Sequence, residues 1–187
     1  FLPRDLRPGE RRAAIFAHHQ HAGQFHWGKS EVAGLAGNPE QAYALELGRR
    51  GYIVLAPDAI CFEERSPYQG NLDTPTDPTP GRDYERFEFT MRVLYGSCLQ
   101  TKMLWDMQRG LDYLESRADV DATRLGCIGH SLGGQQTLFL AAMDARVQAA
   151  VSSCGFGSLT TILRDGINHN FGAYVPGWLA HGDVGDL

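Results

Sequence analysis

The chain has 187 residues, an apolar content of 43% and a formal net charge of −5. It is long enough for one domain with a sizeable buried core and too short for two. The charges are spread without a basic block, so neither a nucleic acid nor an anionic membrane surface is expected as a partner. No apolar run approaches the ~20 residues that a membrane-spanning helix needs.

The cysteines are widely separated and form no CxxC pair. They are Cys61, Cys98, Cys127 and Cys154. Neither a zinc knuckle nor a redox motif is therefore expected, and reduced thiols favour a cytoplasmic location. The first residues lack the layout of a signal peptide. Because the chain does not begin with Met, a leader that has been removed stays an alternative.

The first predicted elements form a strand–helix–strand unit. The apolar runs Ala13–Ala17 and Tyr52–Ala56 are typical of strands buried on both faces of a parallel sheet. Between them, Asn38 can cap a helix, Pro39 suits its first turn and Gly51 follows its last turn. We therefore expect a crossover helix between two parallel strands.

A proline-rich stretch, residues 57 to about 95, interrupts this rhythm with Pro67, Pro75, Pro78 and Pro80. A long irregular insertion after the carboxyl end of a strand lies at the edge where open α/β sheets bind ligands. Two interpretations are open, a cap that shapes a substrate pocket and a surface excursion that packs only for stability. The run Glu63-Glu64-Arg65 could bind a polar substrate group, but a solvated charged face is the commoner role of such a run.

The second half of the chain continues the alternation of helices and strands. Ser97-x-x-Gln100 resembles a capping box, and apolar residues recur at helical spacing up to about Arg117. The remaining predicted elements are a strand at Leu125–Ile128, a helix at Gly133–Asp144 and a strand at Val147–Val151. This order predicts right-handed crossovers and a mostly parallel sheet covered on both faces, that is, a three-layer α/β sandwich.

The sequence Gly129-His130-Ser131-Leu132-Gly133 has the form Gly-x-Ser-x-Gly. The bare pattern means little, but here it follows a predicted buried strand and opens a helix, which is the setting of a nucleophile elbow. Glycine at both ends avoids collisions with the strand and the helix while Ser131 is held in a strained turn. Ser131 is therefore the predicted nucleophile. A structural serine in a glycine-rich turn is the alternative.

An oxyanion hole needs two donors. The first is expected to be the backbone N–H of Leu132 at the helix start. The second should come from the loop after the strand Ala13–Ala17, from the backbone of His21 or, failing that, of Gln20.

Several histidines in and near this loop raise the question of a metal. They are His18, His19, His21 and His26. No Asp, Glu or Cys with ligand spacing accompanies them, so no metal site and no cofactor are expected. His130 is expected to pack beside the nucleophile rather than act as its base.

The chain resembles the dienelactone hydrolase-like branch of the α/β-hydrolases, which includes acetyl xylan esterase-like proteins. The matching stretches are His19-Gln20-His21, Gly28 to Gly34, Arg50 to Asp58, and the elbow running on to Ser152-Ser153-Cys154-Gly155-Phe156. The resemblance implies the α/β-hydrolase fold and a small-molecule acyl ester as substrate. Ser131 would attack the acyl carbonyl, and water would release the acyl group.

The resemblance also implies a triad of serine, acid and histidine in that chain order, with the last two after the seventh and eighth strands. The strands here look like the third to the sixth, and Cys154, Gly155 and Phe156 after the last of them include no carboxylate. We therefore expect a fold incomplete at both ends, with acid and base beyond Leu187 and the 187 residues alone nearly inactive. His169 and His181 are the weaker candidates for the base.

Two rival functions stay open. A serine peptidase of the prolyl-oligopeptidase type shares the catalytic fold and carries a propeller domain that would lie upstream of Phe1. A non-catalytic homologue could bind a ligand or a partner in the same pocket, although such proteins often lose the serine that this chain keeps. The sequence does not indicate an oligomeric state.

Overall fold

The structure is a computed structural model that describes residues 1–67, 79–166 and 170–186. Its helices and strands are, in order, β1 (Arg12–His18), α1 (Lys29–Val32), α2 (Tyr43–Arg49), β2 (Ile53–Leu55), α3 (Thr79–Leu94), α4 (Leu99–Ser116), β3 (Val120–His130), α5 (Leu132–Met143), β4 (Val147–Ser153) and α6 (Leu159–Arg164). Short 3-10 helices lie at η1 (Pro39–Gln41), η2 (Glu63–Arg65), η3 (Phe171–Ala173) and η4 (Trp178–Ala180).

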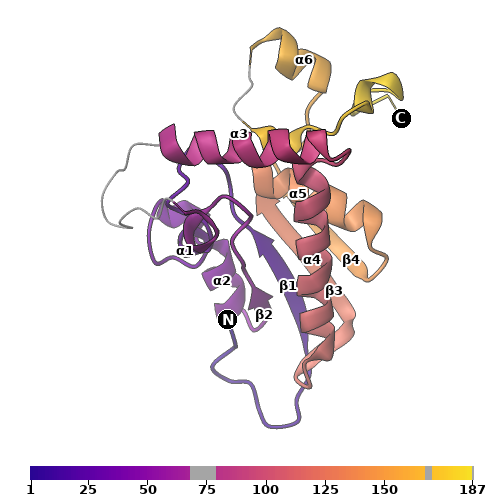
Figure 1. The fold of residues 1–187 in the computed structure, drawn as a ribbon. Coiled ribbons are helices and arrows are strands. Elements are labelled where there is room, and N and C mark those ends of the chain that lie inside the picture. Colours follow the sequence, from indigo (N-terminus) through magenta and orange to yellow (C-terminus); the bar gives the residue numbers. More distant parts are fainter. Residues whose placement is uncertain (68–78, 167–169, 187) are drawn as a thin grey trace.

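The strands form one parallel sheet in the order β2-β1-β3-β4 (Figure 1). β1 lies between β2 and β3, with Phe16 opposite Leu55 on one side and Cys127 on the other. Because parallel strands need crossover connections, α4 and α5 link the strands across one face. The predicted parallel sheet is confirmed.

Alternating residues of β1 supply the core on the two faces of the sheet. Ala14 and Phe16 pack in the cluster that contains side chains of α4 and α5, and Gly110 of α4 lets the Phe16 ring approach the helix backbone closely. Ala17 instead packs with Val32 of α1 and Ala44 of α2 on the other face. This alternation follows from the two-residue repeat of a strand. The three-layer α/β arrangement is therefore confirmed.

Two helix starts differ from the sequence-based expectation. The Asn38 side chain accepts a hydrogen bond from the N–H of Glu40 at 3.0 Å, but it caps η1, and α2 begins only at Tyr43. The capping box at the start of α4 is wrong. The cap position is Cys98, and no side chain there makes a cap hydrogen bond. Gln100 does not reach back to the helix start, because its side chain is buried and its amide pairs with that of Gln136 on α5.

The insertion between β2 and α4 is not irregular throughout, since residues 79–94 form α3. α3 lies across the end of the molecule where the strands terminate (Figure 1). Gly81 of α3 sits so close to Phe25 that a Cβ there would come within 2.5 Å of the Phe25 side chain. The expected irregularity is therefore wrong for this part, while Pro75 and Pro78 lie outside the described residues.

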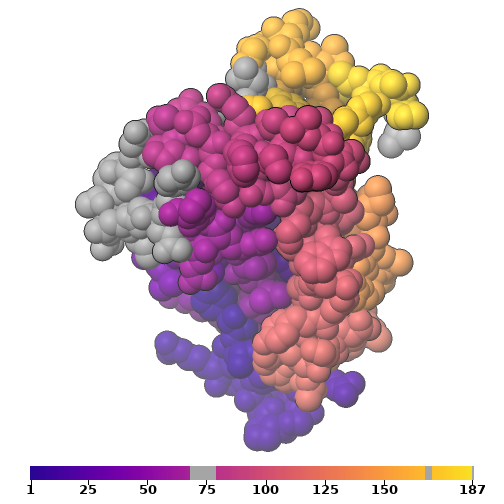
Figure 2. Space-filling view, viewed as in Figure 1, coloured from indigo at the N-terminus to yellow at the C-terminus, as the bar shows by residue number. Residues whose placement is uncertain are grey.

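Beyond β4 the molecule is more open. Val151 of β4 is 57% exposed, and within the described ranges no strand pairs with the outer edge of β4 or of β2. The segment after β4 stands out beyond α3 (Figure 2) and touches α5 where Trp178 packs edge-on against Phe139. In the part of the chain that is described, no helix is long and apolar enough to cross a membrane.

Candidate active site

Ser131 occupies the sharp turn between β3 and α5. Its backbone has φ 55° and ψ −117°, a conformation that is strained for any residue with a side chain. The N–H of Ser131 donates to the carbonyl oxygen of Ser153 at 2.8 Å, and the carbonyl oxygen of Ser131 accepts from Gln135 at 3.0 Å. These two hydrogen bonds join the turn to the end of β4 and to the first turn of α5, so the surrounding structure holds the strain.

The glycines of the motif are required by close backbone approach. A Cβ on Gly129 would lie 2.2 Å from the carbonyl group of Gly133, and a Cβ on Gly133 would lie 2.3 Å from the carbonyl oxygen of His18. Real Cβ atoms do not approach other atoms so closely. The start of α5 is therefore pressed against both the end of β3 and the end of β1, which brings the elbow beside the loop that follows β1.

Leu132 is the first residue of α5, and its N–H has no acceptor among the described residues. The first N–H groups of a helix have no partner within the helix, and the helix dipole favours negative charge there. The side chain of Leu132 is buried. The backbone N–H next to the serine is thus positioned to bind an oxyanion.

The loop after β1 begins with a histidine of defined tautomer. The ring Nε2 of His19 accepts from the N–H of Ala59 at 2.9 Å, so the proton is on Nδ1, which donates to the carbonyl oxygen of Gln20 at 2.8 Å. Burial lowers the pKa of His19 and keeps the ring neutral. The Gln20 side chain donates to Glu31 at 2.8 Å. The residue before His21 is therefore held through both backbone and side chain.

His21 is fixed in the same way and connects the loop to α3. Its Nδ1 accepts from the N–H of Gly23 at 3.0 Å, so its Nε2 carries the proton and donates to Glu85 at 3.2 Å. The ring packs edge-on against Phe25 and Phe62, and the Glu85 side chain is fully buried. The sequence does not reveal Glu85, because it lies 64 residues from His21 in a stretch that was expected to be irregular.

A network of charged side chains lies beside the loop after β1. The ammonium group of Lys29 lies 2.8 Å from both Asp58 and Glu63, and the hydroxyl of Ser30 donates to Glu63 at 2.6 Å. Arg65 pairs with Asp106 at 2.8 Å. The expected solvated face is therefore wrong for Glu63 and Arg65, which make these internal contacts.

No histidine ring of the described residues hydrogen bonds to Ser131. His130 contacts the hydroxyl of Ser153 at 2.9 Å, and His181 is exposed at the end of η4. Neither ring hydrogen bonds to Ser131 within the described part, and His169 lies outside it. No group of three or more possible metal ligands occurs among the described residues.

Ser131 lines an open groove of about 540 Å³ on the β4 side of the elbow. Its other walls are mostly apolar and include Phe139 of α5, Phe156 after β4, and Trp178 of η4. The serine is thus reached through a mostly apolar groove. Gly155 also lines the groove, and a Cβ added to it would collide with Gly134 of α5.

Two known proteins are similar to this chain. The Bacillus subtilis (strain 168) protein YtaP, described as a hydrolase, is 29% identical over 177 residues, which are 93% of this chain and 54% of YtaP. A solved structure from Bacteroides fragilis NCTC 9343, described as an acetyl xylan esterase, superposes with a TM-score of 0.63 at 18% identity over 78% of this chain and 37% of that one. The chain thus spans about half of YtaP and a smaller part of the esterase.

The solved structure supports the α/β-hydrolase fold, whereas the family follows from the sequence. Residues 30–172, which include the elbow and most of the helices and strands, match the dienelactone hydrolase family. The strained serine, the glycines around it and the strands β2, β3 and β4 lie within this range. The chain belongs to the dienelactone hydrolase family.

Proposed function

We propose that the chain is the nucleophile-bearing part of a serine hydrolase that cleaves a carboxylic ester of the acetyl ester or lactone type. The observation that carries the proposal is the backbone of Ser131, which is strained at φ 55° at the start of a helix. Strain of this kind persists at functional sites because the surrounding structure enforces it. The esterase description of the Bacteroides fragilis relative supports the choice of substrate class.

The proposed reaction follows from the position of the serine. Ser131 Oγ forms a bond to the acyl carbon and its proton passes to a general base, while the N–H groups of Leu132 and His21, or Gln20, bind the oxyanion. The alcohol then leaves with that proton, and the acyl group stays on Ser131. Water attacks the acyl-enzyme with the help of the same base, which releases the carboxylic acid and restores the hydroxyl.

The base and its acid are proposed to lie outside residues 1–187. This fits the described residues, where no imidazole hydrogen bonds to Ser131. His181 and His169 stay the weaker candidates. A serine without a base is a poor nucleophile at neutral pH. The 187 residues alone are therefore expected to be nearly inactive, and the tests below use the full-length protein.

We propose that α3, the helical part of the insertion, is a cap over the loop after β1. This loop carries the second proposed oxyanion donor and is called the oxyanion loop below. Glu85 and Gly81 of α3 meet His21 and Phe25 directly, which a surface excursion packed only for stability would not require. The substrate would then lie between this loop and the groove at Ser131.

A fluorophosphonate probe tests the proposal. Full-length wild-type protein should be labelled covalently, and Ser131→Ala should not be labelled, because the probe reacts with activated serines. Ser116→Ala, on the exposed surface of α4, is the matched control and should be labelled like the wild type. A folded wild-type protein that is not labelled would instead indicate a non-catalytic member of the family. Release of p-nitrophenol from p-nitrophenyl acetate would then establish ester cleavage.

A further inference from the structure

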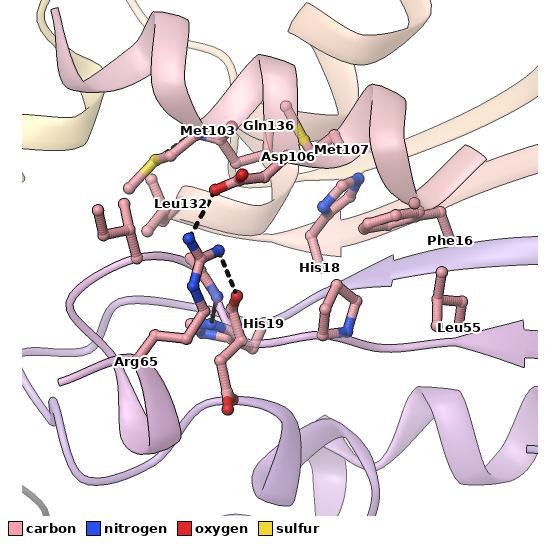
Figure 3. Close-up of a pocket in the computed structure, with 15 residues that line it drawn as sticks. Phe16, His18, His19, Leu55, Arg65, Met103, Asp106, Met107, Leu132 and Gln136 are labelled. Atoms are coloured by element: carbon pink, nitrogen blue, oxygen red, sulfur yellow. Dashed lines mark hydrogen bonds and ion pairs between the residues drawn. The ribbon is translucent and has the colours of Figure 1, made fainter. Parts of the chain in front are cut away.

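A second cavity lies between α4 and the sheet, and Ser131 does not line it. It has a volume of about 250 Å³, and its apolar walls are Phe16, Leu55, Met103, Met107 and Leu132. Figure 3 shows His18 and Phe16 of β1 near Met107 of α4, and Met103 of the same helix beside Leu132. Ser131 and His21 are not among the residues that line it. The cavity is therefore distinct from the groove at the nucleophile.

The polar side chains on the cavity wall are paired, with one exception. His19, Arg65 and Gln136 make the hydrogen bonds described above. His18 is only 6% exposed, and its Nε2 has no hydrogen-bond partner among the described residues. A buried polar group without a partner destabilises the fold, because it has lost its hydrogen bonds to water and gained none. Among the described residues that line the cavity, His18 Nε2 is thus the one buried side-chain nitrogen or oxygen atom without a hydrogen-bond partner.

The cavity suits a neutral molecule rather than an ion. Burial lowers the pKa of His18 to about 3, so the ring is uncharged at neutral pH and offers one donor and one acceptor. The charged side chains on the wall are already paired, Arg65 with Asp106, which also contacts Lys102, and Asp58 with Lys29. A charged ligand would lose its hydration without gaining an opposite charge, which is costly in an apolar site.

We propose that this cavity binds a small neutral molecule with an apolar ring and one hydroxyl group, which hydrogen bonds to the imidazole of His18. An apolar cavity of about 150 Å³ is enough to bind benzene, so this one has room for a ring with substituents. Met103 and Met107 have flexible, polarisable side chains that adapt to such a ring. The occupant would touch Leu132, the neighbour of the serine, although the binding site does not depend on the proposed esterase function.

The experiment compares two probes, p-cresol and toluene, which differ only in the hydroxyl group. Binding to the full-length protein is measured by calorimetry and by the rise in melting temperature. One hydrogen bond to a buried partner should make p-cresol bind about tenfold more tightly than toluene. His18→Phe should abolish this preference, because it removes both ring nitrogens.

His26→Phe is the matched control. His26 is also 6% exposed and its Nε2 also lacks a partner among the described residues, but it does not line the cavity, so this variant should keep the preference for p-cresol. If His18→Phe does not fold, the ¹⁵N shifts of the His18 ring in the wild type during p-cresol titration give the same information. The proposal is overturned if neither probe binds, if both bind equally, or if the His18 nitrogens do not respond. Fluorophosphonate labelling is a separate readout, so failure here leaves the proposed function standing.

Discussion

The two sides of the elbow are built differently. On the β1 side, buried polar side chains bond to partners far along the chain, as Glu85 does to His21 and Asp58 to the half-buried Lys29. On the β4 side, apolar side chains such as Phe156, 67% exposed, face the groove, and the polar contacts are made at the surface. Many contacts with neighbouring elements fix the first side, whereas few contacts hold the second side.

This difference indicates that the two sides of the elbow have different roles around Ser131. Buried polar side chains that hydrogen bond to one another fix geometry, because moving one of them leaves a buried group unsatisfied. The proposed oxyanion loop lies on that side. The open apolar side suits substrate entry, which requires tolerance of shape rather than precision.

The largest expected effect comes from Gly133→Ala. The added Cβ would lie 2.3 Å from the carbonyl oxygen of His18, so β1 and α5 would have to separate. We expect a loss of about 3 kcal/mol or more in the free energy of unfolding, measured by urea denaturation of the full-length protein. Gly157→Ala on the β4 side is the matched control, since its Cβ would meet only Ile162 at an ordinary 3.6 Å and should change stability by less than about 0.5 kcal/mol. Equal stability of the two variants would contradict the contrast between the sides.

A smaller effect is expected from Glu85→Leu. This variant removes the acceptor of the His21 Nε2–H and should let the proposed oxyanion donor move. Direct loss of such a donor costs about 10²–10³ in kcat, and we expect indirect misplacement to cost about tenfold in kcat with KM unchanged. Glu85→Gln keeps an acceptor oxygen and should recover most of the rate.

The control for Glu85 is Glu88→Leu, which removes a carboxylate from the next turn of α3, where it pairs with Arg92 instead of the loop. This variant should keep the wild-type kcat. If Glu85→Leu raises KM but leaves kcat unchanged, α3 affects substrate binding and not the oxyanion loop.

The helices and strands that could be predicted are those whose sequence pattern lies within the element itself. The runs that became β1 and β2 are short and apolar, and the spacing of Met103, Met107 and Leu111 predicts α4. The glycines of the elbow could also be predicted, because a side chain at either position would collide with the strand or the helix. α3 was missed because few of its residues are buried and prolines precede it, so its pattern resembles a loop.

The contacts of the site that could not be predicted join residues far apart in the chain. Asp58 meets Lys29 across 29 residues and Glu85 meets His21 across 64, so no local pattern reveals either pair. The internal position of Glu63 cannot be predicted for the same reason, since its partners, Ser30 and Lys29, come from α1. Chain topology, not composition, decides which of these carboxylates are internal.

The smallest expected effect concerns the attachment of the β4-side segment. The hydroxyl of Ser158 and the N–H groups of Thr160 and Leu159 donate to Asp183, and these hydrogen bonds hold the pKa of its carboxyl well below its usual range. A lowered pKa in the folded state means that this attachment is complete above the ordinary carboxyl pKa of about 4 and is lost as the pH falls through the folded pKa.

Hydrogen exchange measures this attachment amide by amide. Relative to the intrinsic exchange rate at each pH, protection of the Leu159 and Thr160 amides should fall as the pH decreases below about 4, while the strand amides of β1 and β3 stay protected. Asp183→Asn keeps an acceptor oxygen but cannot titrate, so it should show slightly lower protection that does not change over the same range. Asp186→Asn is the control, because Asp186 contacts the N–H of Asp183 but not α6. If Asp183→Asn and the wild type depend on pH in the same way, another group attaches the segment, and the β4 side is held more firmly than its exposed contacts indicate.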